Sequence, residues 1–266
     1  MRNYIRQTAR MTAKLLADHE PKPVTVDRKN GQSAIVLSCD HASKAIPERL
    51  GDLGLAKSEL GRHIAWDIGA AGVSQYLSEL LDAPLVLQNY SRLVIDCNRT
   101  SDHDQLIPLL SEATTIPGNR DLSVEVRAQR YDEIFRPYHE TIAELLDQRL
   151  LEERSSAFVA IHSFTPSYLG NRRPWHIGIL YGCDRRMAEK ILEQLDGDST
   201  CCVGDNEPYR IDEKDYGIPV HGEGRGLPHV LIELRQDLIE TEAKQREWAE
   251  KLSPLLLDAL NVVVAA

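Results

Sequence analysis

The segment Ser33–Cys39, with the sequence SAIVLSC, is an apolar, β-branched run that is followed at once by Asp40 and His41. A run of this length and composition predicts a buried strand. A polar residue at the end of such a strand can point into a crevice, whereas inside the strand it would be costly unless it were satisfied. The segment therefore predicts a core strand that delivers reactive side chains at its carboxyl end.

The rest of the chain alternates between strand-like and helix-like patterns. Six more runs predict strands: Pro84–Gln88, Leu93–Cys97, Ala157–His162, Trp175–Tyr181, Thr200–Val203 and His229–Leu234. Four stretches with apolar residues at i, i+3 and i+4 predict amphipathic helices: Leu60–Leu81, Ser123–Glu153, Arg185–Gln194 and Gln236–Leu260. This alternation predicts an α/β fold, with a mostly parallel or mixed central sheet and helices on both faces.

The absence of repeats and linkers indicates how many domains the chain has. No internal repeat and no Gly/Ser-rich linker divides the 266 residues. We therefore expect a single domain over residues 1–266, with a helical leader at 1–30 and a loop insertion near the site at 205–228.

Composition excludes several classes of protein. The chain is 42% hydrophobic and 27% charged, as is usual for a folded globular protein. Its formal net charge of −10 argues against nucleic acids or membrane surfaces as partners.

Five cysteines without a C-x-x-C pair indicate reduced thiols. The N-terminal segment has no signal-peptide-like apolar run, so we expect a cytoplasmic protein; a mitochondrial-type presequence is the alternative for this Arg-rich start.

Reactive side chains gather where predicted strands end. Besides His41, these ends supply His162, the segment 96–99 and the segment 233–235. Because the carboxyl ends of parallel strands meet at one edge of a sheet, we expect these residues to share one crevice.

His41 and His162 are the most informative pair in the sequence. Two imidazoles and one carboxylate, with a fourth position left for water, form the ligand set of a catalytic zinc. Asp67, which interrupts an otherwise apolar helix face, is our first choice for the carboxylate, and Glu48 and Asp40 are the alternatives. A purely structural role remains the other interpretation of each histidine.

Glu233 lies between Ile232 and Leu234, where a lone carboxylate would be costly to bury. Near a metal it would serve as the general base for an attacking water and the general acid for a leaving nitrogen. The alternative is that Glu233 pairs with Arg235 or with another buried base.

Arg92 and Arg99 lie at the two ends of the segment SRLVIDCNR, with Asn98 beside the second. Arginine pairs bidentately with carboxylates, so these residues are candidates for binding an anionic substrate. A structural ion pair with Asp96 is an equally good interpretation of Arg92. Arg172, in a polar loop after HSFTP, is a further candidate for a basic lining.

Other motifs point to no second activity. His221, in the glycine-rich VHGEGRG, is either a ligand or proton carrier on a loop or, as we favour, a surface histidine. Ser43 and Ser163 each neighbour a histidine but lack the G-x-S-x-G context of a serine hydrolase. The chain contains no dinucleotide-binding or P-loop motif.

A set of motifs between about residues 33 and 240 resembles the N-formylglutamate amidohydrolase family; they are DHAS with IPE, HIAWDIGA, YSRLVIDCNR, RYDEIFRPYHE, IHSFTP and GLPHVLIELRQDLI. The arrangement is also similar to that of zinc carboxypeptidases and acyl-amino-acid deacylases. The resemblance implies a zinc-exopeptidase-like fold, His41 and His162 as zinc ligands, Glu233 as acid and base, and Asn98 with Arg99 as anchors for a substrate carboxylate.

The chain departs from the H-x-x-E pattern that supplies the second ligand in those deacylases. Lys44 stands three residues after His41, so the carboxylate ligand must come from elsewhere, and this supports Asp67.

These observations predict an amidohydrolase with one Zn²⁺ per chain that cleaves a small anionic N-acyl amino acid, such as N-formyl-L-glutamate to formate and glutamate. Arg92 would stabilise the oxyanion, and Arg235 and Arg172 would help Asn98 and Arg99 to bind the substrate. The alternatives are a zinc metallopeptidase for short acidic peptides and a non-catalytic small-acid binding protein. The oligomeric state is left open.

Overall fold

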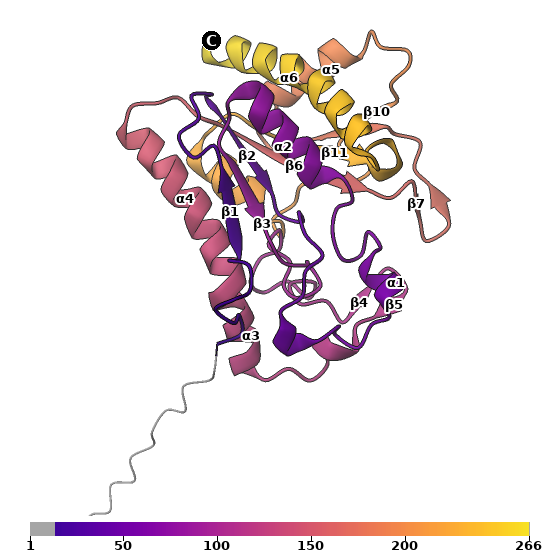
Figure 1. The fold of residues 1–266 in the computed structure, drawn as a ribbon. Coiled ribbons are helices and arrows are strands. Elements are labelled where there is room, and N and C mark those ends of the chain that lie inside the picture. Colours follow the sequence, from indigo (N-terminus) through magenta and orange to yellow (C-terminus); the bar gives the residue numbers. More distant parts are fainter. Residues whose placement is uncertain (1–13, 266) are drawn as a thin grey trace, which may run out of the picture.

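The computed structural model describes residues 14–265, which form a seven-stranded mixed sheet with helices on both faces (Figure 1). The strand order is β1-β3-β2-β6-β11-β9-β10. The strands are β1 Val24–Asp27, β2 Ile35–Cys39, β3 Leu85–Gln88, β6 Ala157–Phe164, β9 Ile177–Leu180, β10 Val203–Asp205 and β11 His229–Arg235.

The centre of this sheet is parallel. Strands β3, β2, β6 and β11 run in one direction, whereas β1 and β9 are antiparallel to their neighbours β3 and β11. In the pairing of β6 with β11, His162 lies opposite Glu233. The predicted α/β fold with a mostly parallel or mixed sheet is therefore confirmed, and the polar ends of β2, β6 and β11 meet at one edge.

Alternation along β2 shows how the two cores are built. Ile35 and Leu37 pack with helices α2, α5 and α6, whereas Val36 packs with α4 on the opposite face. The larger helices are α2 Ala70–Leu81, α3 Val124–Arg130, α4 Arg136–Leu151, α5 Arg186–Leu195 and α6 Glu242–Ala265. A π-helical turn, η3 Tyr131–Phe135, joins α3 to α4.

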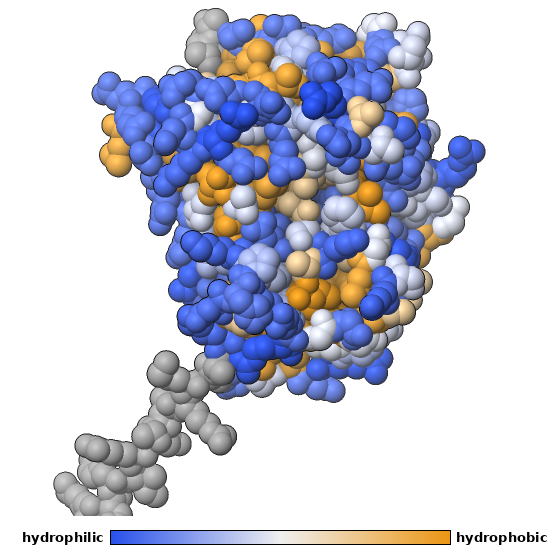
Figure 2. Space-filling model, viewed as in Figure 1, coloured by the Kyte–Doolittle hydropathy of each residue, from blue (hydrophilic) through white to orange (hydrophobic). Residues whose placement is uncertain are grey.

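Short elements complete the described chain. They are η1 Glu48–Leu50, α1 Lys57–Leu60, β4 Leu110–Ser111, β5 Thr114–Thr115, η2 Pro117–Asn119, β7 Ser167–Tyr168, β8 Asn171–Arg172, η4 Ile218–Gly222, η5 Glu223–Arg225 and η6 Gln236–Leu238. The face in Figure 2 is largely hydrophilic, with apolar residues in separate groups. Among the described helices, none combines the length and the hydropathy that a membrane span requires.

Two predicted elements were wrong in whole or in part, and a third, the strand at Thr200–Val203, overlaps β10 at Val203 alone. Residues 93–97 form turns instead of a strand, because Val94 N–H donates to Ser91 O and Asp96 N–H donates to Leu106 O rather than to a neighbouring strand. The predicted helix at Leu60–Leu81 begins only at Ala70. Gly69 before it has φ +83°, and a Cβ there would lie 2.3 Å from Ile239 O, so the preceding segment cannot continue as a helix.

The predicted leader at 1–30 lies partly outside the described residues, whereas the predicted insertion at 205–228 lies wholly within them. Residues 14–30 contain β1 and turns but no helix, and residues 1–13 lie outside the described residues. Residues 206–217 form an irregular loop that continues into η4. The single-domain organisation remains a prediction.

Candidate metal and active site

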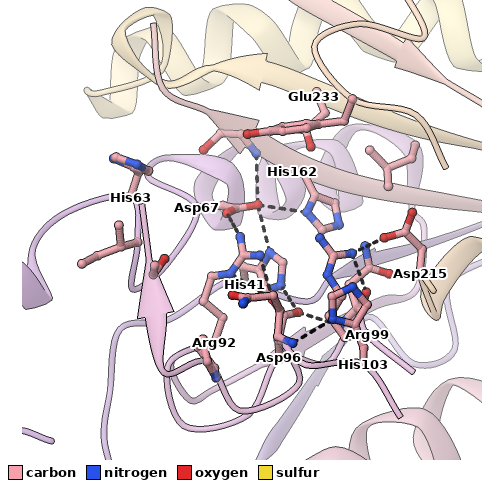
Figure 3. Close-up of a pocket in the computed structure, with 18 of the residues that line it drawn as sticks. His41, His63, Asp67, Arg92, Asp96, Arg99, His103, His162, Asp215 and Glu233 are labelled. Carbon is pink, nitrogen blue, oxygen red and sulfur yellow. Dashed lines mark hydrogen bonds and ion pairs between the residues drawn. The ribbon is translucent and has the colours of Figure 1, made fainter. Parts of the chain in front are cut away.

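A cavity of about 580 Å³ opens at the carboxyl ends of β2, β6 and β11 (Figure 3). Its lining includes seven of the nine residues expected in the site: His41, Asp67, Arg92, Asn98, Arg99, His162 and Glu233. Polar ends of parallel strands therefore meet where the fold rule for α/β sheets places a ligand site.

Three of these residues form a candidate metal site. One ligand atom each from His41, Asp67 and His162 lies within 4.8 Å of the other two. Asp67 Oδ2 is 3.3 Å from His41 Nδ1 and 3.0 Å from His162 Nδ1, and the three side chains point toward one another (Figure 3). All three are buried. Two imidazole nitrogens and one carboxylate oxygen are the donors of a catalytic zinc site that keeps one position open.

Backbone hydrogen bonds hold Asp67 between the two strands that carry the histidines. Asp67 N–H donates to His41 O at 3.0 Å, and Ser163 N–H donates to Asp67 Oδ2 at 3.2 Å. Asp67 is therefore placed by the loop before α2, and not by the helix face on which the sequence pattern had put it.

The other two carboxylate candidates lie elsewhere. Glu48 is exposed and pairs with His19 at 3.1 Å. Asp40 is buried behind His162, with Oδ2 3.5 Å from its Nε2, and accepts a hydrogen bond from Tyr138 Oη at 2.5 Å. Asp40 is therefore outside the candidate metal group and lies on the side of His162 away from it.

Asp96 lies against the other histidine and, unlike Asp40, is hydrogen-bonded to it. Its Oδ1 lies 2.8 Å from His41 Nε2. Arg92 donates to Asp96 Oδ2 from Nε and Nη2 at 3.1 and 2.7 Å, and Asn98 N–H donates to Oδ1 at 2.9 Å. Metal-binding histidines commonly use their second nitrogen in this way, which fixes the tautomer and the ring orientation. In both rings Nδ1 is the nitrogen that faces Asp67.

Charge in this cluster favours a cation. Burial by itself would raise the pKa of Asp67, but the two histidines outweigh burial and hold its pKa far below the usual range. Burial would lower the pKa of His162, yet the neighbouring carboxylates of Asp40 and Asp67 raise it well above normal. Three buried carboxylates around two imidazoles therefore stabilise positive charge between them, so the residues present fit a divalent metal.

Glu233 faces the same cavity from β11. Its Oε2 is buried and has no hydrogen-bond partner among residues 14–265. Burial, with a further contribution from Asp67, raises the pKa of Glu233 to about 7 against the opposing effect of His162. A carboxyl group that titrates near neutrality is suited to accept and return a proton. Arg235 does not pair with Glu233, since it donates to Asp237 Oδ1 at 2.8 Å.

The arginines of the site are already paired. Arg92 forms an ion pair with Asp96, and its Nη1 is 3.6 Å from Asp67 Oδ1. The structure therefore contains the ion pair with Asp96 that the sequence allowed as one interpretation of Arg92. Arg99 Nη1 donates to Asp215. Asn98 Oδ1 accepts hydrogen bonds from the backbone N–H groups of residues 216 and 217, at 3.2 and 2.9 Å.

Two predicted substrate-binding residues do not line this cavity. Arg172 is exposed in β8, and Arg235 is held by Asp237 and by the carbonyl oxygens of Pro174 and Trp175. Their proposed contact with substrate therefore has no support in the geometry. His221 also lies outside this cavity and is buried, which makes the expected surface position wrong.

Sequence reasoning missed several residues of the wall, namely His63, His103, Tyr209, Arg210 and Asp215. Three of them come from the segment predicted as a loop insertion near the site. The signal was therefore the segment as a whole, since the sequence pattern singled out none of these three residues.

Comparison with known proteins identifies the family. The family model for N-formylglutamate amidohydrolase matches residues 33–240, which is most of the chain. The chain belongs to the N-formylglutamate amidohydrolase family. The resemblance drawn from the motifs is thereby confirmed, and the family is one of hydrolases that act on amide bonds, as its name states.

Three individual proteins are similar to this chain in sequence or in fold. The chain is 34% identical over 134 residues to an N-formylglutamate deformylase of Pseudomonas aeruginosa, a match that covers 43% of this chain and about half (49%) of that protein. A gene product of Agrobacterium tumefaciens has the same fold, with a TM-score of 0.91 and 38% identity over 94% of this chain and 99% of that one. An N-formylglutamate amidohydrolase of Ralstonia eutropha shares the fold at a TM-score of 0.72, with 18% identity over 92% of this chain and all of that one (100%).

Proposed function

We propose that this chain is a zinc-dependent amidohydrolase that cleaves N-formyl-L-glutamate to formate and glutamate. The observation that carries the proposal is the convergence of His41, Asp67 and His162 with Glu233 in one cavity. The family and the similar deformylase of Pseudomonas aeruginosa support the choice of substrate.

His41 Nδ1, His162 Nδ1 and an oxygen of Asp67 would hold the metal. When bound, zinc would lower the pKa of a coordinated water and polarise the formyl oxygen. Asp96 would keep the His41 ring oriented through its hydrogen bond, and the Asp40 carboxylate, 3.5 Å from His162 Nε2, would attract a proton on that nitrogen and leave Nδ1 for the metal.

Glu233 moves the proton in this proposal. Its carboxylate would accept a proton from the water that attacks the formyl carbon and then donate it to the departing amine nitrogen. A pKa of about 7 suits both steps, because the group is easily charged and easily protonated near neutrality.

Arg99 and Asn98 would bind a carboxylate of the substrate. Asp215 holds Arg99, and backbone N–H groups occupy Asn98 Oδ1, which leaves the amide nitrogen of Asn98 as its donor. Arg92 lies on the same wall, and its positive charge would favour an oxyanion although Asp96 and Asp67 share that charge.

Release of formate from N-formyl-L-glutamate by the purified, zinc-loaded chain tests the proposal. N-Acetyl-L-glutamate and short acidic peptides are the comparison substrates, because faster cleavage of a peptide would establish the metallopeptidase alternative. Binding of N-formyl-L-glutamate without turnover would establish the non-catalytic alternative.

Glu233→Gln should lower kcat by about 10²–10⁴-fold, because it removes the proton acceptor and keeps the shape of the side chain. Its zinc content, measured by elemental analysis, should equal that of the wild type. Turnover within a few fold of the wild-type value would place the base on another residue.

A further inference from the structure

Tyr209 is a residue of the cavity wall that the proposed chemistry does not use. It lies in the irregular loop after β10 and lines the same cavity as His41, His162 and Glu233. The residue is 42% exposed, so it is not sealed inside the wall. Tyr209 is therefore accessible to a substrate that enters the cavity.

Arg173 holds the phenol of Tyr209 in place. Its guanidinium carbon lies 4.7 Å from the centre of the Tyr209 ring and 4.8 Å from that of Tyr168, another residue of the cavity wall. Its Nη1 donates a hydrogen bond to Tyr209 Oη at 2.8 Å. The backbone N–H of Arg173 donates to Pro166 O at 2.9 Å, which ties the arginine to the base of the hairpin β7–β8. The ring contacts and the hydrogen bond together fix the position of the phenol oxygen.

The same hydrogen bond determines how Tyr209 can act. A guanidinium group can only donate, so the phenol oxygen is the acceptor of this pair. The O–H of Tyr209 is directed elsewhere, and it donates to no group among residues 14–265. Hydrogen bonds in a chain polarise one another, so an arginine that donates to a phenol oxygen makes its O–H a stronger donor. Tyr209 thus brings one free donor to the cavity.

The charges that act on this phenol come from the groups of the proposed chemistry. Burial raises the pKa of Tyr209, and the charge of Glu233 raises it further, whereas Arg173 and Arg92 oppose both effects. The phenol therefore keeps its proton near pH 7. It also lies within electrostatic range of Glu233 and Arg92, the residues expected on either side of the reacting group.

An oxyanion is stabilised best by a donor that has no other acceptor. Arg92 already shares its charge with Asp96 and Asp67, whereas the O–H of Tyr209 has no acceptor within the described chain. We propose that Tyr209 is a further catalytic residue, which donates a hydrogen bond to the acyl oxygen of the substrate as that oxygen gains negative charge, and that Arg173 positions it. This inference rests on the proposed amidohydrolase function. The phenol keeps its own proton throughout.

Tyr209→Phe removes the donor and keeps the ring. The assay uses whichever of N-formyl-L-glutamate, N-acetyl-L-glutamate and a short acidic peptide the wild type cleaves fastest. The variant should lower kcat and kcat/KM alike by about 10²–10³-fold, the usual cost of losing one oxyanion donor. Its KM should change by less than about threefold and its zinc content not at all. Unchanged kinetics, or a higher KM with unchanged kcat, would overturn the proposal.

Tyr181→Phe is the matched control and should keep wild-type kinetics. Tyr181 also has an arginine over its ring and a hydrogen-bonded hydroxyl, but it does not line the cavity.

A double variant tests whether Arg173 acts through Tyr209. Arg173→Gln alone should lower kcat by about tenfold or more, because the phenol loses its hydrogen-bond donor. Arg173→Gln combined with Tyr209→Phe should be no slower than Tyr209→Phe alone, since the two residues then serve one interaction. Losses that multiply in the double variant would overturn the positioning role of Arg173.

The wild-type substrate profile separates this inference from the proposed function. Cleavage of the acetyl or peptide amide, and not of the formyl amide, would contradict the proposed substrate but not the role of Tyr209, which the variants test on that amide. Cleavage of none of the three compounds by the zinc-loaded chain would overturn both proposals.

Discussion

Two buried pairs of histidines lie in opposite electrostatic surroundings in this protein. His41 and His162 are in contact with three carboxylates, and hydrogen bonds and charges from these carboxylates raise the pKa of both rings despite burial. His139 and His221 lie among aromatic rings, where burial lowers both pKa values.

The difference shows what makes a histidine pair into a metal site. A divalent cation needs neutral imidazoles as donors and negative charge nearby to offset its own. Among the described residues, the first pair is in direct contact with such charge, from Asp40, Asp67 and Asp96, whereas Asp40 acts on the second pair only from a distance. The second pair is joined ring to ring, His139 Nδ1 to His221 Nε2 at 3.0 Å, and burial keeps both rings neutral.

Among the predictions, replacement of His41 and His162 should have the largest effect, and the effect is on zinc content. We expect the double variant His41→Ala, His162→Ala to lose its zinc, from about one ion per chain to almost none, because two of three protein ligands are gone. Elemental analysis of the purified proteins measures this. The matched variant His139→Phe, His221→Phe should keep the metal; loss of zinc from it, or retention in the first variant, would break the comparison.

Asp96→Asn should weaken zinc binding by about 10–100-fold, because His41 loses the carboxylate that orients its ring. Competition with a chromophoric chelator gives the affinity without reference to turnover. Asp215→Asn, which changes a carboxylate of the same cavity that pairs with Arg99, is the control and should bind zinc like the wild type. Equal affinities for all three proteins would mean that Asp96 has no part in holding the metal ligand.

Arg99→Gln should raise KM for N-formyl-L-glutamate by about tenfold or more, since hydrogen bonds between charged groups contribute about 1.5–3 kcal/mol. Arg172→Gln should change KM by less than about twofold, because Arg172 does not line the cavity. Steady-state kinetics of both variants measures this. The reverse order of effects would restore Arg172 as a substrate-binding residue.

The smallest expected effect is on the pH dependence of stability. In the unfolded chain His221 has an ordinary pKa near 6.5, whereas in the folded chain it is about 3, so the unfolded state binds more protons below pH 6.5. Stability is therefore complete above that pH and is lost as pH falls, by at most about 1.4 kcal/mol per pH unit for this residue.

Urea unfolding of chelator-treated protein at pH 7, 6 and 5 tests this sign. His221→Phe should lose less stability than the wild type over that range, because one proton-binding group of the unfolded state is gone. Identical pH slopes would show that His221 is not held neutral by the fold.

Much of the site was predictable because strand ends are visible in a sequence. Apolar runs that stop at His41, His162 and Glu233 indicate both the strands and the side chains that leave them at one edge. The run Leu93–Cys97 misled the prediction, since Leu93, Val94 and Ile95 are fully buried in turns and have the same apolar pattern as a strand.

The sequence by itself determined the α/β class, the family, and the two histidines and the glutamate of the proposed chemistry, because local apolar patterns and motifs carry that information. Only the tertiary structure grouped Asp67, rather than Asp40 or Glu48, with both histidines, paired Arg92 with Asp96, and buried His221 beside His139. Each of these depends on distances between loops remote in the chain, and a residue's neighbours in sequence do not specify those distances.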